Sequence, residues 1–254
     1  GFGEAVDRKL LTDYKVLVLA VDEKSVAKTF QLQLEQDGEL HLDDAAKIVG
    51  CWNGLAKRGT AESVFAVDPL PMKRAVAFCG TIKDSKLIQR MFSDLVDTHN
   101  LDNPDDPALS CEVRHGDGSY NALERNTQLD WLRADVPDGE CRILTNARCL
   151  SEGVDVPSLD AVMFLSPRKS QVDVVQSVGR VMRRPPNGTT KNYGYIILPI
   201  GVPAGMSPEQ ALNDNKRYAA VWEALRALRA HDERFDAMIN KIDLTGNTGG
   251  KLII

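Results

Sequence analysis

Six short apolar runs, rich in β-branched residues, recur along this chain and alternate with segments of helical periodicity. The runs lack polar alternation, which is typical of strands covered on both faces. The helix-like segments between them, such as 84–97 and 121–134, supply the crossovers. The runs are residues 16–21, 74–79, 111–113, 142–145, 161–165 and 195–198. We therefore predict an α/β fold, with a parallel, doubly wound sheet and helices on both faces.

One part of the chain near the N-terminus fits this alternation less well. Residues 22–70 contain helix-like segments at 25–35 and 43–57, and the turn-prone Cys51-Trp52-Asn53-Gly54 interrupts the second segment. We interpret 22–70 as an insertion between the first and second strands.

The C-terminal part has a different pattern. After a Pro/Gly-rich stretch, one long helix is expected over 208–242, with Pro208 near its first turn and Gly246 past its end. The predicted organisation is a domain at 1–200, with the insertion at about 22–70, followed by a helical extension at 201–254.

Composition excludes several classes of protein. The 254 residues are 43% hydrophobic and 26% charged, which is enough to bury a full core. The five cysteines are odd in number and form no CxxC pair, which favours reduced thiols in a cytoplasmic protein. None of the four histidines stands at metal-ligand spacing with a cysteine, so no metal site is predicted. No apolar run approaches the roughly 20 residues of a membrane span, and no signal peptide is indicated.

Charge is unevenly distributed along the chain. The net charge is −5, yet residues 165–195 contain six basic side chains and one acid, Asp173. The basic residues are Arg168, Lys169, Arg180, Arg183, Arg184 and Lys191. This cluster surrounds the sequence 176–184, Gln-Ser-Val-Gly-Arg-Val-Met-Arg-Arg.

The sequence 176–184 has the residue types that phosphoryl transfer needs. On a helix, Arg180 and Arg183 would share one face, where two guanidinium groups can grip a polyphosphate. Arg183 suits the stabilisation of charge on a γ-phosphate, Arg180 a second contact, and Gln176 a polar contact with phosphate or water. A surface helix with paired arginines that bind carboxylates, or nothing, is the alternative.

Two further loops follow predicted strands. The first, Thr81 to Ser85, offers hydroxyls and main-chain N–H groups at a helix start, which suit a phosphate. The second runs from Thr145 to Pro157 and contains a Gly-x-Asp-x-Pro turn, in which Asp155 can accept hydrogen bonds from ribose hydroxyls. Each is an ordinary turn when taken alone. In a doubly wound sheet, ligands meet loops at the carboxyl ends of strands.

Together these motifs resemble motifs IV, IVa, V and VI of superfamily 2 helicases, in the second of their two RecA-like lobes. The resemblance covers about residues 70–200. It implies that Arg183 is the arginine finger, Arg180 a neighbouring phosphate contact and Gln176 a nucleotide-linked residue. It also implies nucleotide contacts for Gly153 and Asp155, and nucleic-acid contacts for Thr81, Arg125, Thr145 and His115. For His115, a structural role and a direct contact are equally open.

A closer likeness is to the helicase part of large single-chain type I-like enzymes and type III restriction-modification proteins. It rests on 142–144, on 148–157 and on Arg229-Ala230-His231-Asp232-Glu233-Arg234-Phe235-Asp236. In that family, nuclease and methyltransferase domains share the polypeptide and the motor moves along double-stranded DNA. The DNA phosphate backbone is therefore an expected partner.

One departure from the family limits what this chain does alone. Motifs I and II, the phosphate loop and the Asp-Glu box, belong to the first lobe, and the resemblance does not extend to them. The tail from Gly246 to Leu252 imitates a phosphate loop, but its glycine spacing is short and Leu252 replaces the Ser/Thr. ATP and Mg²⁺ are therefore expected to bind the absent N-terminal lobe, and this part alone is expected to be inactive.

The predicted function is the second motor lobe of an ATP-dependent DNA helicase or translocase. We expect Arg180 and Arg183 to be exposed near Asp155, at the ends of the strands and facing a cleft. The alternatives are a non-catalytic RecA-like module that binds nucleic acid or protein, and the lobe of an RNA helicase.

Overall fold

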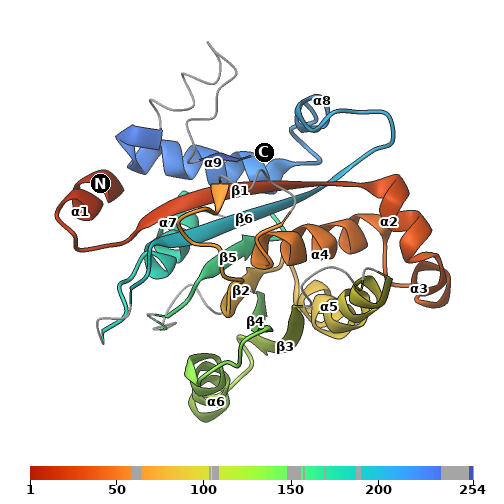
Figure 1. Cartoon of the computed structure of the whole chain (residues 1–254), viewed down its shortest axis with the longest axis horizontal. Coiled ribbons are helices and arrows are strands. Elements are labelled where there is room, and N and C mark those ends of the chain that lie inside the picture. Colours follow the sequence, from red (N-terminus) through yellow and green to blue (C-terminus); the bar gives the residue numbers. More distant parts are fainter. Residues whose placement is uncertain are drawn as a thin grey trace.

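The computed structural model of the chain describes residues 1–58, 64–102, 104, 109–147, 156, 158–168, 170–186, 190–235 and 252–253. Within this part, seven strands form one sheet in the order β3-β4-β2-β5-β6-β1-β7, and every pairing is parallel (Figure 1). Each predicted run falls on one of the first six strands, so the predicted parallel α/β sheet is confirmed. The strands are β1 (Asp13–Asp22), β2 (Arg74–Phe78), β3 (Ser110–Asp117), β4 (Glu140–Ala147), β5 (Ala161–Phe164), β6 (Tyr193–Val202) and β7 (Leu252–Ile253).

Helices cover both faces of this sheet because side chains alternate along each strand. On β1, Leu17 and Leu19 enter one apolar cluster with α2, α4 and α5, whereas Val16 and Val18 enter a second with α6, α7 and α9. The helices are α1 (Phe2–Asp7), α2 (Glu23–Thr29), α3 (Gln31–Gln36), α4 (Leu42–Leu55), α5 (Ile82–Asp102), α6 (Ala122–Arg133), α7 (Gln171–Val181), α8 (Pro208–Leu212) and α9 (Ala219–His231). Two buried layers therefore enclose the sheet.

Helix α4 corrects one detail of the interpretation of residues 22–70, namely the turn expected within it. The helix runs without interruption through Cys51 to Gly54, where a turn was expected. The glycines of α4 allow the helix to pack closely on the sheet. A Cβ on Gly50 would lie 2.9 Å from Cβ of Pro199, and one on Gly54 would lie 2.8 Å from Cδ1 of Ile197. Since both neighbours belong to β6, α4 is a crossover helix seated directly on the sheet and shares its core. The segment predicted at 25–35 is divided into α2 and α3, with Phe30 buried between them.

The single long helix predicted over 208–242 is wrong in its described part. Helix α8 ends at Leu212, and α9 begins only at Ala219, because the turn-forming Asn213-Asp214-Asn215 separates them. Helix α9 buries Val221, Leu225 and Leu228 in the second apolar cluster. This part of the extension therefore shares the core of the preceding strands. Residues 236–242 lie outside the described part.

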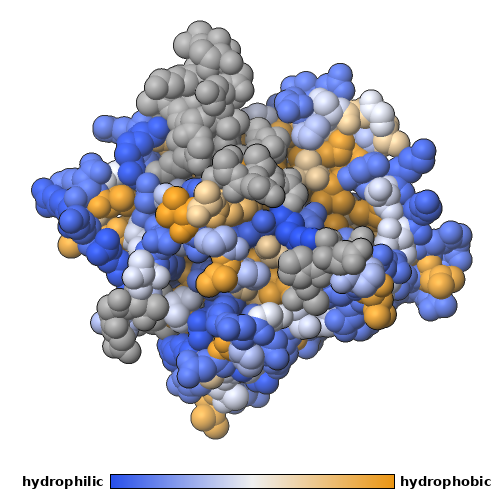
Figure 2. All heavy atoms as spheres, viewed as in Figure 1, coloured by the Kyte–Doolittle hydropathy of each residue, from blue (hydrophilic) through white to orange (hydrophobic). Residues whose placement is uncertain are grey.

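The hydrophilic surface and the unpaired cysteines among the described residues are consistent with the composition. Figure 2 shows a mainly hydrophilic face with apolar residues gathered between α2 and α8. Among the described helices, none is long and apolar enough to cross a bilayer. Cys51, Cys79, Cys111 and Cys141 are buried free thiols, and burial raises the pKa of Cys79 to about 12. Cys149 lies outside the described residues.

Candidate functional site

Helix α7 carries Gln176 and Arg180 of the basic motif. Its N-terminus is capped by Ser170, whose hydroxyl accepts hydrogen bonds from the N–H groups of Val172 and Asp173 at 3.1 and 3.3 Å. Its apolar side, Val174, Val178 and Val181, is buried in the second cluster. The opposite side of the helix leaves Gln176 exposed.

The helix ends before Arg183, in contrast to the prediction that both arginines lie on one helical face. Helix α7 stops at Val181, and Met182 caps it. The backbone N–H of Arg183 then closes a turn on the carbonyl of Arg180 at 3.2 Å. Pro185 follows two residues later and disfavours helical geometry at Arg184. Arg183 therefore projects from a turn rather than from a helix.

The two arginines nevertheless influence each other electrostatically. Arg183 is exposed and Arg180 is half-buried. Burial, and then the nearby charge of Arg183, lowers the pKa of Arg180. Two positive groups held close enough to repel each other suit a polyanionic ligand, whose charge would relieve that repulsion.

The location of the arginines also differs from the expected carboxyl ends of the strands. The ammonium of Lys191, just before β6, donates to the carbonyls of Val181 and Leu159 at 2.5 Å each. Leu159 lies just before β5. The end of α7 is therefore at the amino ends of these strands, because α7 runs back across the sheet after β5. Gly153 and Asp155 lie outside the described residues.

The six basic residues within 165–195 do not form one surface. Arg168 lies at the carboxyl end of β5, where its side chain is only 10% exposed and its guanidinium carbon lies 4.7 Å from the centre of the Phe78 ring. Lys191 lies at the opposite edge, and Lys169 is outside the described part. Residues that are close in the sequence are therefore separated in the structure, and the basic cluster is smaller than the sequence suggested.

Thr81 lies at the start of α5, at the carboxyl edge of the sheet. Its hydroxyl accepts from the N–H of Asp84 at 3.1 Å, and its own N–H donates to the Asp84 carboxylate at 3.1 Å. This reciprocal pair fixes the first turn of α5. Both residues are exposed, so Thr81 is accessible to a ligand.

Thr145 and His115 lie in a buried hydrogen-bonded network instead of at the surface. Ser85 connects them: its hydroxyl lies 2.7 Å from Nδ1 of His115 and donates to Oγ1 of Thr145 at 3.0 Å. Thr145 donates onward to the carbonyls of Ser85 and Arg114, at 3.1 and 3.3 Å. Ser85 and Thr145 have no exposed surface. Their polar groups are satisfied by one another.

Asp117 extends this network. Its carboxylate lies 2.8 Å from Nε2 of His115 and accepts from the hydroxyl and N–H of Ser119. Hydrogen bonds from the Ser119 hydroxyl and from His115 lower the pKa of Asp117 to about 2. Ser85 was expected to offer its hydroxyl to a ligand at the helix start, and Asp117 was not expected in the site. Only the register of β3 beside β4, which sets His115 against Thr145, brings these residues together.

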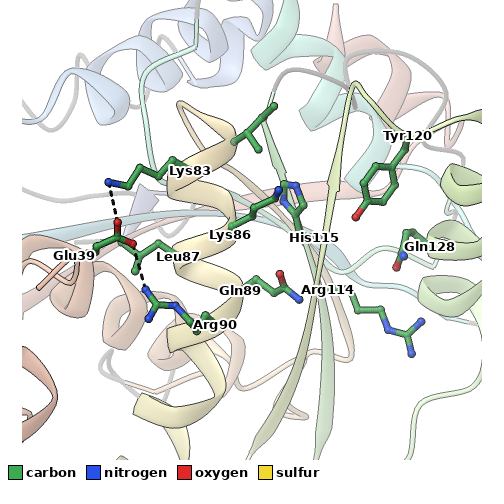
Figure 3. A pocket seen from close by; sticks show the side chains of 11 residues that line it. Glu39, Lys83, Lys86, Leu87, Gln89, Arg90, Arg114, His115, Tyr120 and Gln128 are labelled. Atoms are coloured by element: carbon green, nitrogen blue, oxygen red, sulfur yellow. Dashed lines mark ion pairs between the residues drawn. The ribbon is translucent and has the colours of Figure 1, made fainter. Parts of the chain in front are cut away.

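A groove opens beside the network, between α5 and α6 (Figure 3). Its volume is about 1020 Å³, and its basic side chains outnumber its one acid, Glu39. Glu39 pairs with Lys83 at 3.1 Å and with Arg90 at 3.6 Å. The lining includes Lys83, Lys86, Arg90, Arg114, Tyr120 and Gln128. A basic groove of this kind suits an extended anion.

Arg125 lies on α6, near the groove lining. It is half-buried, and its Nη2 donates to the carbonyl of Tyr120 at 3.5 Å. In the described part of the chain, its Nε is buried and has no hydrogen-bond partner. His115 thus lines the groove, whereas Thr81 and Arg125 are only close in sequence to the lining residues Ile82 and Gln128. Arg180 and Arg183 stand apart, at the other end of the strands. Lys83, Lys86 and Arg90 recur at helical spacing along α5, which is a signal for a basic helix face that is visible in the sequence.

An Asp-Glu pair, Asp22-Glu23, lies where β1 ends and α2 begins, and it was not among the predicted site residues. Both carboxylates are engaged: Asp22 accepts from the N–H of Lys24 at 3.0 Å, and Glu23 pairs with Arg217. The pair therefore caps α2 and anchors the loop before α9. Across the described residues, no group of three or more His, Cys, Asp or Glu side chains suits a metal ion.

Gly179 is the glycine of the 176–184 motif, and a substitution there shows whether the fold needs a glycine at this position. A Cβ there would meet only Cε1 of Phe2, at 3.9 Å. Gly179→Ala is therefore expected to raise stability by about 0.5–1 kcal/mol through helix propensity. The matched control is Gly194→Ala, whose Cβ would lie 2.5 Å from the Val181 carbonyl oxygen and should lower stability. Thermal unfolding compares the two, and a lower midpoint for Gly179→Ala would contradict the expectation.

The comparisons with known proteins agree with the motifs. Residues 64–185 match the family model of the helicase conserved C-terminal domain. A solved structure described as "ATP-dependent Type ISP restriction-modification enzyme LlaBIII bound to DNA" is 46% identical, with a TM-score of 0.84. The match covers 99% of this chain and 16% of that enzyme chain.

Curated relatives match a shorter segment. "Probable helicase A859L" of African swine fever virus (isolate Tick/South Africa/Pretoriuskop Pr4/1996) is 36% identical over 117 residues, and that of isolate Pig/Kenya/KEN-50/1950 is 34% identical over the same length. Each match covers 46% of this chain and 13% of the relative. The chain thus spans a small part of these proteins. The predicted resemblance to the C-terminal lobe of superfamily 2 helicases is confirmed.

Proposed function

We propose that this chain, which carries a helicase conserved C-terminal domain, is the second motor lobe of an ATP-dependent DNA helicase or translocase. The 46% identity to LlaBIII over 99% of the chain supports a restriction-modification protein as its source. ATP and Mg²⁺ bind the first lobe in this proposal. Nuclease and methyltransferase domains are the further partners expected on the same polypeptide.

The observation that carries the proposal is the arginine pair at the end of α7. Arg183 is exposed, Arg180 is half-buried, and burial followed by the charge of Arg183 lowers the pKa of Arg180. When the two lobes close, these guanidinium groups meet the polyphosphate and offset the charge that develops on the γ-phosphate. Gln176, exposed on the same helix, supplies a polar contact to phosphate or water.

The residues that the structure describes do not suit a magnesium ion on their own. In the described ranges no acidic cluster of three is present, and Asp22 and Glu23 are already engaged by Lys24 and Arg217. The chain also has no Gly-x-x-x-x-Gly-Lys-Ser/Thr loop. We therefore expect no ATP hydrolysis by this lobe alone.

The groove between α5 and α6 is the proposed contact surface for the DNA backbone. Lys83, Lys86 and Arg114 line it, and Thr81 presents its exposed hydroxyl at the start of α5. Such groups contact phosphates without reading sequence. Thr145 and His115 act from behind this surface, because their network fixes the start of α5 against the ends of β3 and β4.

The direct test compares the full-length protein with this lobe. ATP turnover is measured with duplex DNA, single-stranded DNA and duplex RNA, and without nucleic acid. Stimulation by duplex DNA in the full-length protein, with no turnover by the lobe, supports the proposal. Equal turnover under all conditions, or stimulation by RNA alone, contradicts the assignment to a DNA motor.

The groove yields a prediction about salt-dependent binding. The double variant Lys83→Glu, Lys86→Glu in the full-length protein is expected to weaken duplex binding roughly tenfold or more, because two phosphate contacts are lost. The slope of log affinity against log salt should fall by about one for each lysine. Fluorescence anisotropy at several salt concentrations measures both quantities.

The matched control is Lys24→Glu, Lys28→Glu on α2, which makes the same change in net charge at two exposed lysines. Neither of these lysines lines the groove. If both double variants weaken binding equally, then only net charge matters and the groove is not the contact surface.

A further inference from the structure

The turn that bears Arg183 is held by contacts from two other parts of the chain. Thr12, just before β1, donates both its N–H and its hydroxyl to the carbonyl of Met182 at 2.8 Å. The ammonium of Lys191, just before β6, donates to the carbonyl of Val181 at 2.5 Å and to that of Arg183 at 3.4 Å. Three successive carbonyl groups at the end of α7 are thus satisfied by side chains and backbone from outside the helix.

The backbone approach at this point is close. A Cβ on Gly194 of β6 would lie 2.5 Å from the carbonyl oxygen of Val181 and 2.9 Å from its carbonyl carbon. The end of α7 therefore rests directly on the backbone of β6. A third contact of Lys191, to the carbonyl of Leu159 at 2.5 Å, links the same turn to the start of β5.

We propose that Lys191 is a positioning residue for Arg183, whose ammonium fixes the carbonyls of the last turn of α7 and so sets the direction of the Arg183 side chain. The inference rests on the proposed role of Arg183 toward the nucleotide. A guanidinium that must reach a γ-phosphate across a cleft depends on a fixed backbone, since misplacement by about 1 Å costs roughly 100-fold in rate.

The chemistry of Lys191 suits this role. Carbonyl groups at a helix C-terminus carry partial negative charge and favour a cation. Burial lowers the pKa of Lys191 to about 8, an effect that the half-buried Asp160 opposes. The side chain therefore stays charged near neutral pH, and its hydrogen bonds are directed to backbone rather than to water. Thr12 and Gly194 hold the turn independently, so the loss of Lys191 should displace Arg183 without unfolding the lobe.

The test uses Lys191→Met in the full-length protein, which keeps an unbranched apolar stem and removes the ammonium. We expect kcat for DNA-stimulated ATP hydrolysis to fall roughly 10- to 100-fold, with KM for ATP nearly unchanged, because ATP binds the other lobe. The matched control is Lys57→Met. That lysine has a side chain only 4% exposed and also donates to a carbonyl, that of Asp68 at 2.7 Å, but it does not contact α7.

A double variant decides whether Lys191 acts through Arg183. In an Arg183→Ala background, Lys191→Met should lower the residual single-turnover rate by less than about twofold, because no finger remains to be positioned. An equal fall in both backgrounds would overturn the inference, as would a fall in kcat no larger than that of Lys57→Met. If Arg183→Ala alone leaves turnover intact, the proposed function fails instead.

Discussion

In the full-length protein, Arg183→Ala is expected to lower DNA-stimulated ATP turnover by about 1,000-fold or more, while ATP affinity changes little. The size follows from the loss of a guanidinium that acts on the transition state, an effect of roughly 10³ to 10⁵ in related phosphoryl-transfer systems. Affinity is spared because most contacts to ATP belong to the other lobe, so the loss appears in kcat. Steady-state turnover with saturating duplex DNA and fluorescent-nucleotide binding measure the two quantities.

The neighbouring Arg184 provides a matched control for this substitution. It is exposed, as Arg183 is, and belongs to the same turn, so Arg184→Ala removes the same charge one residue away. We expect it to keep most of the turnover. Equal losses for both variants would show that the local positive charge, rather than a directed finger, drives hydrolysis. Retention of turnover by Arg183→Ala would refute the assignment of Arg183.

Trp52→Ala is expected to destabilise the whole lobe by about 3–5 kcal/mol, the usual cost of removing a large buried aromatic side chain. Trp52 is 2% exposed on α4, and its indole N–H donates to the carbonyl of Leu109 at 3.0 Å. Its ring centre lies 4.6 Å from that of His99 on α5. Because α4 shares one apolar cluster with α5 and the sheet, the loss should reach all of them.

Hydrogen exchange of the full-length protein, followed by mass spectrometry, locates this loss. Protection should fall together in α4, in α5 and in the strands β1 and β6. If protection falls only in residues 23–55, that segment is an independent unit after all. Trp222→Ala is the matched control: its indole also donates to a carbonyl, that of Leu212 at 2.9 Å, but the side chain is half-buried, so a smaller loss is expected.

The apolar runs predicted the strands because their signal is local. A strand covered on both faces needs consecutive apolar residues, and such a run is visible without knowledge of its partners. The same local logic failed at Cys51 to Gly54, which was interpreted as a turn, although Gly50 and Gly54 both lie within α4. Their actual cause is the approach of Pro199 and Ile197, which lie almost 150 residues later in the chain.

For the motif residues, too, local spacing indicated some features and tertiary contacts decided others. The spacing of Gln176, Arg180 and Arg183 supports the proposal of a phosphate-directed group, since that chemistry depends on residue types that are close in the sequence. The burial of Thr145 and His115 was not predictable, because it depends on Ser85 and on the register of β3 against β4. A threonine at the end of a strand looks the same in sequence whether its hydroxyl faces solvent or a neighbouring strand.

The sequence by itself determined the parallel sheet and the family resemblance and singled out the arginine pair as a candidate, because each depends on short-range pattern and residue chemistry. Only the tertiary structure decided where these groups lie. Arg183 is at the amino ends of β5 and β6, held by Thr12 and Lys191, while the basic groove lies at the carboxyl edge. The physical reason is that strand order and the return path of α7 bring distant backbone carbonyls and side chains together, and no local pattern encodes that order.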